Sequence, residues 1–125
     1  MIEEHNKAVF RCYLEIWRTG NILEINDITS DAYIGHASAG DRDRQELAAR
    51  VQAFQILFPD IVFTIEDQIA VSDKVITRIT ARGTHQLSGK ATTLIGINIS
   101  RIQEGRIVEE WPVWERLSDS YSDYQ

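Results

Sequence analysis

The sequence lacks the features that stabilise secreted proteins or anchor membrane proteins. Among its 125 residues Cys12 is the only cysteine, so no internal disulfide can form, which fits a reducing compartment. The N-terminal segment MIEEHNKAVF is acidic and amphipathic, unlike the basic start and apolar core of a signal peptide. No apolar run approaches the roughly 20 residues of a membrane-spanning helix. We therefore expect a cytoplasmic protein with no membrane partner.

The chain also has little positive charge and none of the common motifs for metals, phosphates or nucleophiles. It carries 13 Lys and Arg against 19 Asp and Glu, a net charge of −6, which argues against nucleic acid as a partner. The histidines are scattered, without His-x-His or His-x-x-x-His spacing, so we expect no metal site. Neither a glycine-rich phosphate loop nor a G-x-S-x-G motif occurs. Cys12 lies on the apolar side of a predicted helix, so we expect a buried, unreactive thiol.

The elements that are present predict a single α+β domain. Apolar residues recur at helical spacing before Pro59, and they alternate with polar residues after it. The expected elements are helices over 9–17, 22–28 and 47–58, a brief strand over 33–36, strands over 61–71 and 75–85, and a hairpin over 92–115. Helices followed by antiparallel strands define the α+β class. We place the domain at residues 1–117 and a flexible tail at 118–125.

The hairpin over residues 92–115 is the most informative segment, because both of its faces carry apolar side chains. Such a hairpin belongs at the centre of a sheet. A three-residue loop, Gln103–Gly105, uses Gly105 in the left-handed conformation and makes Asn98 face Glu110. A two-residue loop would instead make Asn98 face Trp111 and place the apolar residues of the two strands on mismatched faces. We favour the three-residue loop.

This register predicts one polar and one apolar face for the hairpin. The polar face, with the small residues expected of a pocket wall, carries Gly96, Asn98, Ser100, Glu110, Pro112 and Trp114. The apolar face carries Ile95, Ile97, Ile99, Ile107, Trp111 and Val113. One layer of helices cannot cover both faces of a sheet, and exposed apolar patches of this size usually mark an interface. We therefore expect a homodimer through the apolar face.

The chain resembles the SnoaL-like polyketide cyclases, also called ester cyclases, of the NTF2-like superfamily. The resemblance covers nearly the whole length and rests on Phe58-Pro59-Asp60, Arg82-Gly83-Thr84-His85, Gly96-Ile97-Asn98-Ile99 and the segment EGRIVEEWPVWE at 104–115. It implies a cone of helices on a curved, mostly antiparallel sheet that encloses an apolar pocket. It also implies activity on a small organic ligand without a metal or organic cofactor. In cyclases of this group an acidic residue follows the tryptophan of the last strand and acts as acid or base, whereas this chain has Pro112 there and Glu110 where many relatives have histidine.

Glu110 is the first candidate for catalysis. On the pocket face Pro112 and Trp114 would desolvate its carboxylate and raise its pKa, as a general acid or base requires. The alternatives are an ion pair with Arg78 or Arg82, or a position at a solvated rim. Asn98 would orient this carboxylate or bind a substrate carbonyl, or it would only satisfy a buried polar position.

His36 is the second catalytic candidate, since the resemblance places its segment at the pocket mouth, although a lone histidine is more often structural or exposed. Arg78, Thr80 and Arg82 share one strand face, which the resemblance turns toward the pocket and which could equally face solvent. The full set of substrate-binding candidates is Asn98, Arg78, Thr80, Arg82, Tyr13, Trp17 and Trp114. Tyr13 and Trp17 would otherwise belong to the core.

Two classes of function follow from the sequence. In the first, the protein is an enzyme that uses acid/base chemistry on a small, largely apolar carbonyl compound, with ring closure as the main reaction. Hydration, dehydration, isomerisation or epoxide hydrolysis would be variants in the same pocket. In the second, the protein binds a small molecule without catalysis. Glu110 with Asn98 favours the enzyme, and Pro112 favours the binding module.

Overall fold

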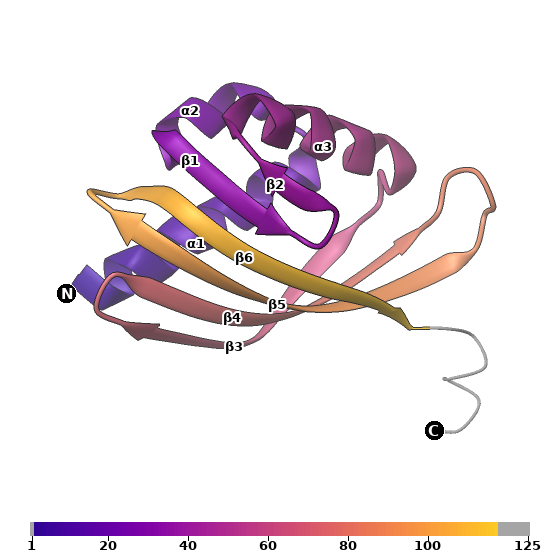
Figure 1. Cartoon of the computed structure of the whole chain (residues 1–125). Coiled ribbons are helices and arrows are strands. Elements are labelled where there is room, and N and C mark those ends of the chain that lie inside the picture. The colour runs from indigo at the N-terminus through magenta and orange to yellow at the C-terminus, as the bar shows by residue number, and fades with distance from the viewer. Residues whose placement is uncertain (1, 118–125) are drawn as a thin grey trace.

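The computed structural model describes residues 2–117, which form helices packed on a six-stranded sheet (Figure 1). In chain order the elements are α1 (Ile2–Thr19), η1 (Ile22–Glu24), α2 (Ile25–Ile28), β1 (Thr29–Ala37), β2 (Gly40–Arg42), α3 (Arg44–Leu57), β3 (Val62–Val71), β4 (Lys74–Thr84), β5 (Ala91–Gln103) and β6 (Arg106–Leu117). The tail predicted over residues 118–125 lies outside the described residues. Within 2–117, no helix is both long and apolar enough to cross a membrane.

The sheet has the strand order β2-β1-β6-β5-β4-β3, so the predicted hairpin lies at its centre. Only the β1–β6 pair is parallel among the described strands. The sheet curves, and the helices lie on its concave side (Figure 1). We call this side the inner face and the opposite side the outer face. The predicted α+β class, with a curved and mostly antiparallel sheet, is confirmed.

The helices begin and end at residues that the sequence marks for these roles. Gly20, with φ of 75°, follows the last residue of α1, where the left-handed conformation favours glycine. The carboxylate of Asp43 accepts a hydrogen bond from the Glu46 backbone at 2.8 Å, which forms a capping box at the start of α3. Cys12 is exposed, contrary to expectation, because α1 turns the positions next to it toward the sheet instead.

The hairpin turn between β5 and β6 has two residues, where the sequence predicted three. Gln103 pairs with Arg106, and the loop residues Glu104 and Gly105 have φ angles of 53° and 75°. Positive φ at both central positions is the pattern of a type I′ turn, whose twist matches that of the flanking strands. The predicted three-residue loop is therefore wrong.

A β-bulge at Val108 preserves the predicted polar face in spite of the shorter loop. Ile102 pairs with Ile107 and Arg101 with Glu109, so Val108 is an extra residue and the alternation of β6 shifts by one position. The next inner pairs are Ser100–Glu110, Asn98–Pro112 and Gly96–Trp114. The bulge also turns Ile107, predicted on the apolar face, into the core, where it is fully buried. Asn98 and Glu110 are consequently diagonal neighbours on the inner face.

Candidate active site

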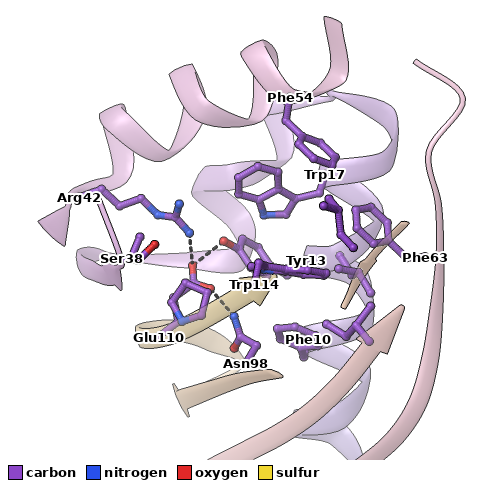
Figure 2. A pocket seen from close by; sticks show the side chains of 15 residues that line it. Phe10, Tyr13, Trp17, Ser38, Arg42, Phe54, Phe63, Asn98, Glu110 and Trp114 are labelled. Carbon is purple, nitrogen blue, oxygen red and sulfur yellow. Dashed lines mark hydrogen bonds and ion pairs between the residues drawn. The ribbon is translucent and has the colours of Figure 1, made fainter. Parts of the chain in front are cut away.

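A cavity of about 260 Å³ lies between α1, α3 and the inner face of the sheet. Its apolar wall consists of Phe10, Tyr13, Leu14, Trp17, Ala37, Phe54, Phe63, Ile79, Leu94, Pro112 and Trp114. Its other lining residues are Ser38, Arg42, Asn98 and Glu110. Figure 2 shows these polar side chains together on one side of the cavity, opposite Phe54 and Phe63. The cavity therefore has a polar end and an aromatic end.

The carboxylate of Glu110 is the centre of the polar end. It is 1% exposed and accepts hydrogen bonds from two tyrosines of different elements. The Tyr13 hydroxyl of α1 donates to Oε2 at 2.5 Å, and the Tyr33 hydroxyl of β1 donates to the same oxygen. Arg42 of β2 lies against this oxygen as well, with Nη2 at 3.4 Å. Side chains from α1, β1 and β2 thus meet at a single carboxylate oxygen of β6.

The second oxygen of Glu110 has one partner. Nδ2 of Asn98 donates to Oε1 at 2.7 Å, and Oδ1 of Asn98 accepts from the Ser100 hydroxyl at 2.6 Å. Within the described part of the chain, no buried side-chain nitrogen or oxygen lacks a hydrogen-bond partner. A carboxylate can accept about four hydrogen bonds in total. Oε1 therefore keeps capacity to accept a bond from a ligand.

Arg42 reaches Glu110 across a glycine. Arg42, Gly35 and Glu110 are register partners on the neighbouring strands β2, β1 and β6. A Cβ atom on Gly35 would lie 2.8 Å from Nε of Arg42, so only glycine leaves room for this side chain. Nε of Arg42 also donates to the Tyr33 hydroxyl at 3.2 Å, and the guanidinium lies 5.5 Å from the ring centre of Trp17. Such a cation–π contact fixes the guanidinium further.

The surroundings shift the pKa values of the groups that bind Glu110. Burial raises the pKa of Tyr13 well above its usual value, and the charge of Glu110 adds to this shift. Burial and Glu110 also raise the pKa of Tyr33. For Arg42 burial lowers the pKa, but Tyr13 and Glu110 more than offset this effect, so its pKa lies above the usual value. At neutral pH both tyrosines are therefore neutral hydrogen-bond donors and Arg42 is a cation.

The structure brings five of the predicted site residues together at the cavity. Tyr13, Trp17, Asn98, Glu110 and Trp114 all line it. Trp114 lies over Gly96, since a Cβ on that glycine would be 2.5 Å from the indole ring. The ring also packs edge-to-face on Phe63, with 6.3 Å between the ring centroids. Because Trp114 is 38% exposed, it forms part of the boundary between cavity and solvent.

Three predicted substrate-binding residues lie away from the cavity. On β4 the buried positions are Val75, Thr77, Ile79 and Ala81, so Arg78, Thr80 and Arg82 alternate onto the outer face. The spacing predicted correctly that these three side chains share one face of β4. The side of the sheet to which that face was assigned was wrong. The resemblance turned these residues toward the pocket, whereas packing of the apolar positions against α1 turns them away. Glu110 accordingly pairs with Arg42, and not with Arg78 or Arg82, the two partners that the alternative interpretation named.

The side chain of His36 also lies on the outer face and not in the pocket, although Ala37 and Ser38 of the same segment line the cavity, as the resemblance implied. In β1 the inward positions are Tyr33 and Gly35, so the alternation of the strand turns His36 to the opposite side. There Nδ1 contacts Asp41 at 2.9 Å and Nε2 contacts Glu109 at 2.7 Å.

Three polar residues of the site, Tyr33, Ser38 and Arg42, were not predicted. Tyr33 could have been recognised, because side chains three positions apart in a strand face opposite sides, so Tyr33 and His36 cannot share the pocket. Arg42 gave no such signal, because it follows a turn and belongs to a strand of only 3 residues. Among residues 2–117, no group of three or more His, Cys, Asp or Glu side chains is placed to hold a metal ion.

The comparisons with known proteins agree with the fold. The family model of the SnoaL-like polyketide cyclases matches residues 7–119. No curated protein gives a significant match. IdmH, a proposed polyketide cyclase from Streptomyces antibioticus, is 27% identical, with a TM-score of 0.80 over 88% of this chain and 91% of that one. A proposed polyketide cyclase from Bacillus cereus is 25% identical, with a TM-score of 0.80 over 89% of this chain and 74% of that one.

A third structure shares the fold at lower identity. It is a proposed polyketide cyclase from Acidithiobacillus ferrooxidans, 22% identical, with a TM-score of 0.80 over 92% of this chain and 91% of that one. Because the family model covers most of the sequence, the chain belongs to the SnoaL-like polyketide cyclase family.

Proposed function

We propose that the protein is a cyclase that uses acid/base chemistry on a small, largely apolar carbonyl compound, with Glu110 as the proton acceptor. The observation that carries this proposal is the buried Glu110 carboxylate at the polar end of an aromatic-lined cavity. A carboxylate positioned in a ligand pocket can act as a general base. The cyclases among the solved structures, and the family itself, support the same reaction class.

In the proposed reaction Oε1 of Glu110 takes a proton from the carbon next to a substrate carbonyl. This oxygen is chosen because Asn98 is its only hydrogen-bond donor, whereas Oε2 is bound by Tyr13, Tyr33 and Arg42. The electron pair of the broken C–H bond forms an enolate, which attacks a second carbonyl carbon and closes the ring. The resulting alkoxide takes back the proton that Glu110 holds.

Asn98 and Arg42 would stabilise the charge that develops on the substrate. Both line the cavity, and each has an N–H group besides the one that it directs at Glu110, whereas the single O–H of Tyr13 is donated to Glu110. Donors fixed in place before the reaction contribute more than mobile water, because they need no reorganisation. The aromatic end would hold the apolar part of the substrate and exclude water from the enolate.

A second candidate is a protein that binds a small molecule without catalysis. Two observations favour it. Glu110 is held by four donors, among them the guanidinium of Arg42, an arrangement that also suits a carboxylate with a structural role. Pro112 lines the cavity at the position where cyclases of the family carry an acidic residue. The experiment must therefore separate turnover from binding.

The test is a screen of small aromatic and polyene carbonyl compounds, followed by Glu110→Gln on any compound that binds. The screen includes epoxides and hydroxy ketones, because hydrolysis, hydration, dehydration and isomerisation are variants of the same chemistry. We expect Glu110→Gln to lower kcat by about 10²- to 10⁴-fold with much less change in affinity. Glu66→Gln, at an exposed position of β3, is the matched control and should leave both unchanged. Wild-type protein that binds ligands without converting any would favour the binding module.

We further propose that the protein works in the cytoplasm as a homodimer that pairs the outer faces of two sheets. Three apolar side chains of the central strands are exposed there, Ile95 at 39%, Ile97 at 49% and Val113 at 67%. Their neighbours Ile99 and Trp111 line the same shallow groove. A contiguous apolar surface of this kind usually pairs with a second protein surface, and a twofold dimer is the commonest solution.

A further inference from the structure

The position of Arg42 depends on a weak part of the sheet. Arg42 is the last residue of β2, a strand of 3 residues at the sheet edge that pairs with β1 alone. The parallel pairing of β1 with β6 is itself interrupted by a register shift between Thr29 and Ile34. A short edge strand has few backbone hydrogen bonds, so its side chains contribute much of what holds it in place.

A chain of side chains crosses the same three strands on the outer face. Asp41 of β2, His36 of β1 and Glu109 of β6 lie in a row, with His36 in contact with both carboxylates. Asp41 pairs with His36 in register and is bonded in sequence to Arg42. Glu109 in turn is bonded in sequence to Glu110. We call Asp41, His36 and Glu109 the outer row, and Arg42, Gly35 and Glu110 the inner row. The two rows lie on opposite faces of the same three strands.

The outer row depends on the charge of the imidazole. Both ring nitrogens can donate to the two carboxylates only when His36 is protonated, since a neutral imidazole has a single N–H. The hydrogen bond to Glu109, and then the one to Asp41, raises the pKa of His36. Two other groups lie near the ring. Arg101 of β5 contacts Glu109 at 3.2 Å, and Trp111 of β6 stacks on the His36 ring, with 5.3 Å between the ring centroids.

We propose that His36 is a positioning residue for Arg42: its protonated ring ties β2 to β6 on the outer face and so keeps the guanidinium on Glu110 across Gly35. When the ring loses its proton, one of the two carboxylate contacts is lost and β2 is held by fewer bonds. Arg42 then leaves Glu110 and Tyr33 more often. If Glu110 is the base of the proposed reaction, His36 would tune it with pH without touching the substrate.

The test follows the Nε–H group of Arg42, which donates to the Tyr33 hydroxyl, by ¹H–¹⁵N NMR between pH 5.5 and 9. Arg42→Lys assigns the signal. The internal reference is Nε–H of Arg44, which donates to Thr29 at 3.0 Å and is subject to the same base-catalysed exchange. The quantity measured is the ratio of the two solvent-exchange rates. No substrate is needed, so failure of the cyclase proposal and failure of this one are separate results.

We expect the Arg42-to-Arg44 ratio to rise several-fold with the same midpoint as the His36 ring signals. In His36→Gln the ratio should stay constant over this pH range. His85→Gln, the same substitution at the start of the β4–β5 connection, is the matched control and should behave as the wild type. A ratio that stays flat while the His36 ring titrates would overturn the proposal, and so would an unchanged rise in His36→Gln.

A second variant keeps the test decisive if His36→Gln does not fold. Asp41→Asn removes one of the two negative partners, so the midpoint of the His36 ring should move to lower pH. We expect the midpoint of the exchange ratio to move with it. A lowered ring midpoint with an unmoved exchange midpoint would show that Arg42 is independent of His36.

Discussion

Glu109 and Glu110 are neighbours on β6, yet the two faces of the sheet treat them differently. Glu110 points inward, is 1% exposed and is bound by two tyrosines, an asparagine and an arginine. Glu109 points outward, with 27% of its side chain exposed, and contacts His36 and Arg101. Each carboxylate has a cationic partner, but only Glu110 faces a cavity. Burial and a position on the cavity, rather than residue type, distinguish the candidate base from an ordinary surface ion pair.

The largest expected difference between the two faces is in stability. Glu110→Ala leaves Arg42 and two tyrosine hydroxyls buried without their acceptor, so we expect a loss of about 3–5 kcal/mol in the free energy of unfolding. Glu109→Ala removes a partly solvated group and should cost much less. Urea unfolding of both variants measures the difference. Equal losses would show that the two carboxylates are not distinguished by burial.

The next largest effect is expected on dimerisation, when a charge is placed in the apolar part of the outer face. Ile97→Asp places a charge at the centre of the proposed dimer contact, and we expect the dissociation constant to rise by at least about 100-fold, since buried unpaired charges are strongly unfavourable. Leu87→Asp, at an 83% exposed position outside the strands, is the control. Sedimentation velocity at micromolar concentration reports the result. A wild-type protein that sediments as a folded monomer would contradict the dimer.

Substitutions of two glycines on the inner face test how closely its side chains are packed. Gly35→Ala places a Cβ against the buried groups Arg42 and Tyr33, so we expect a loss of about 1–3 kcal/mol in the free energy of unfolding and weaker ligand binding. Gly96→Ala places its Cβ 2.5 Å from the ring of Trp114. Because Trp114 is partly exposed it can move, so the loss should be smaller while the cavity changes shape. Thermal unfolding and ligand titration of both variants check this order.

The smallest expected effect is the pH dependence of the stability that the outer row contributes. The pKa of His36 is raised in the folded protein, so its contribution to stability is complete below its unfolded pKa of about 6.5 and is lost as pH rises through the folded pKa. The stability difference between wild type and His36→Gln should therefore shrink from pH 5.5 to pH 9. Urea unfolding at several pH values measures it. A difference that grows with pH has the opposite sign and would exclude the assigned contacts.

The inner face could be predicted largely from the alternation of one hairpin. Glu110, Asn98 and Trp114 were placed correctly on the pocket side, although Asn98 pairs with Pro112 and not with Glu110. Side chains alternate with a period of two, so a register error of two residues leaves each of them on the same face. The same reasoning misplaced Ile107, because a β-bulge leaves no clear mark in a single sequence. The class of the fold followed from the order of helices and strands, which depends on local patterns alone.

The remainder of the site depends on contacts between distant segments. Arg42 reaches Glu110 through the parallel pairing of β1 with β6, and no local pattern reports which strands become neighbours. For Arg78, Thr80 and Arg82 the pattern gave a common face, but only packing of β4 on α1 decides which side that face takes. Composition and spacing therefore predict faces, and tertiary packing assigns them to the cavity or to the surface.

The most direct measurement of the central claim is exchange of substrate hydrogen with solvent. A carbonyl compound that binds the protein is incubated in D₂O, and deuterium on the carbon next to its carbonyl is followed by mass spectrometry for wild type, Glu110→Gln and Glu66→Gln. If Glu110 is the proton acceptor, wild type and Glu66→Gln incorporate deuterium equally fast, and Glu110→Gln is slower by about 10²-fold or more although it still binds the compound. Incorporation by Glu110→Gln at the wild-type rate would contradict the account.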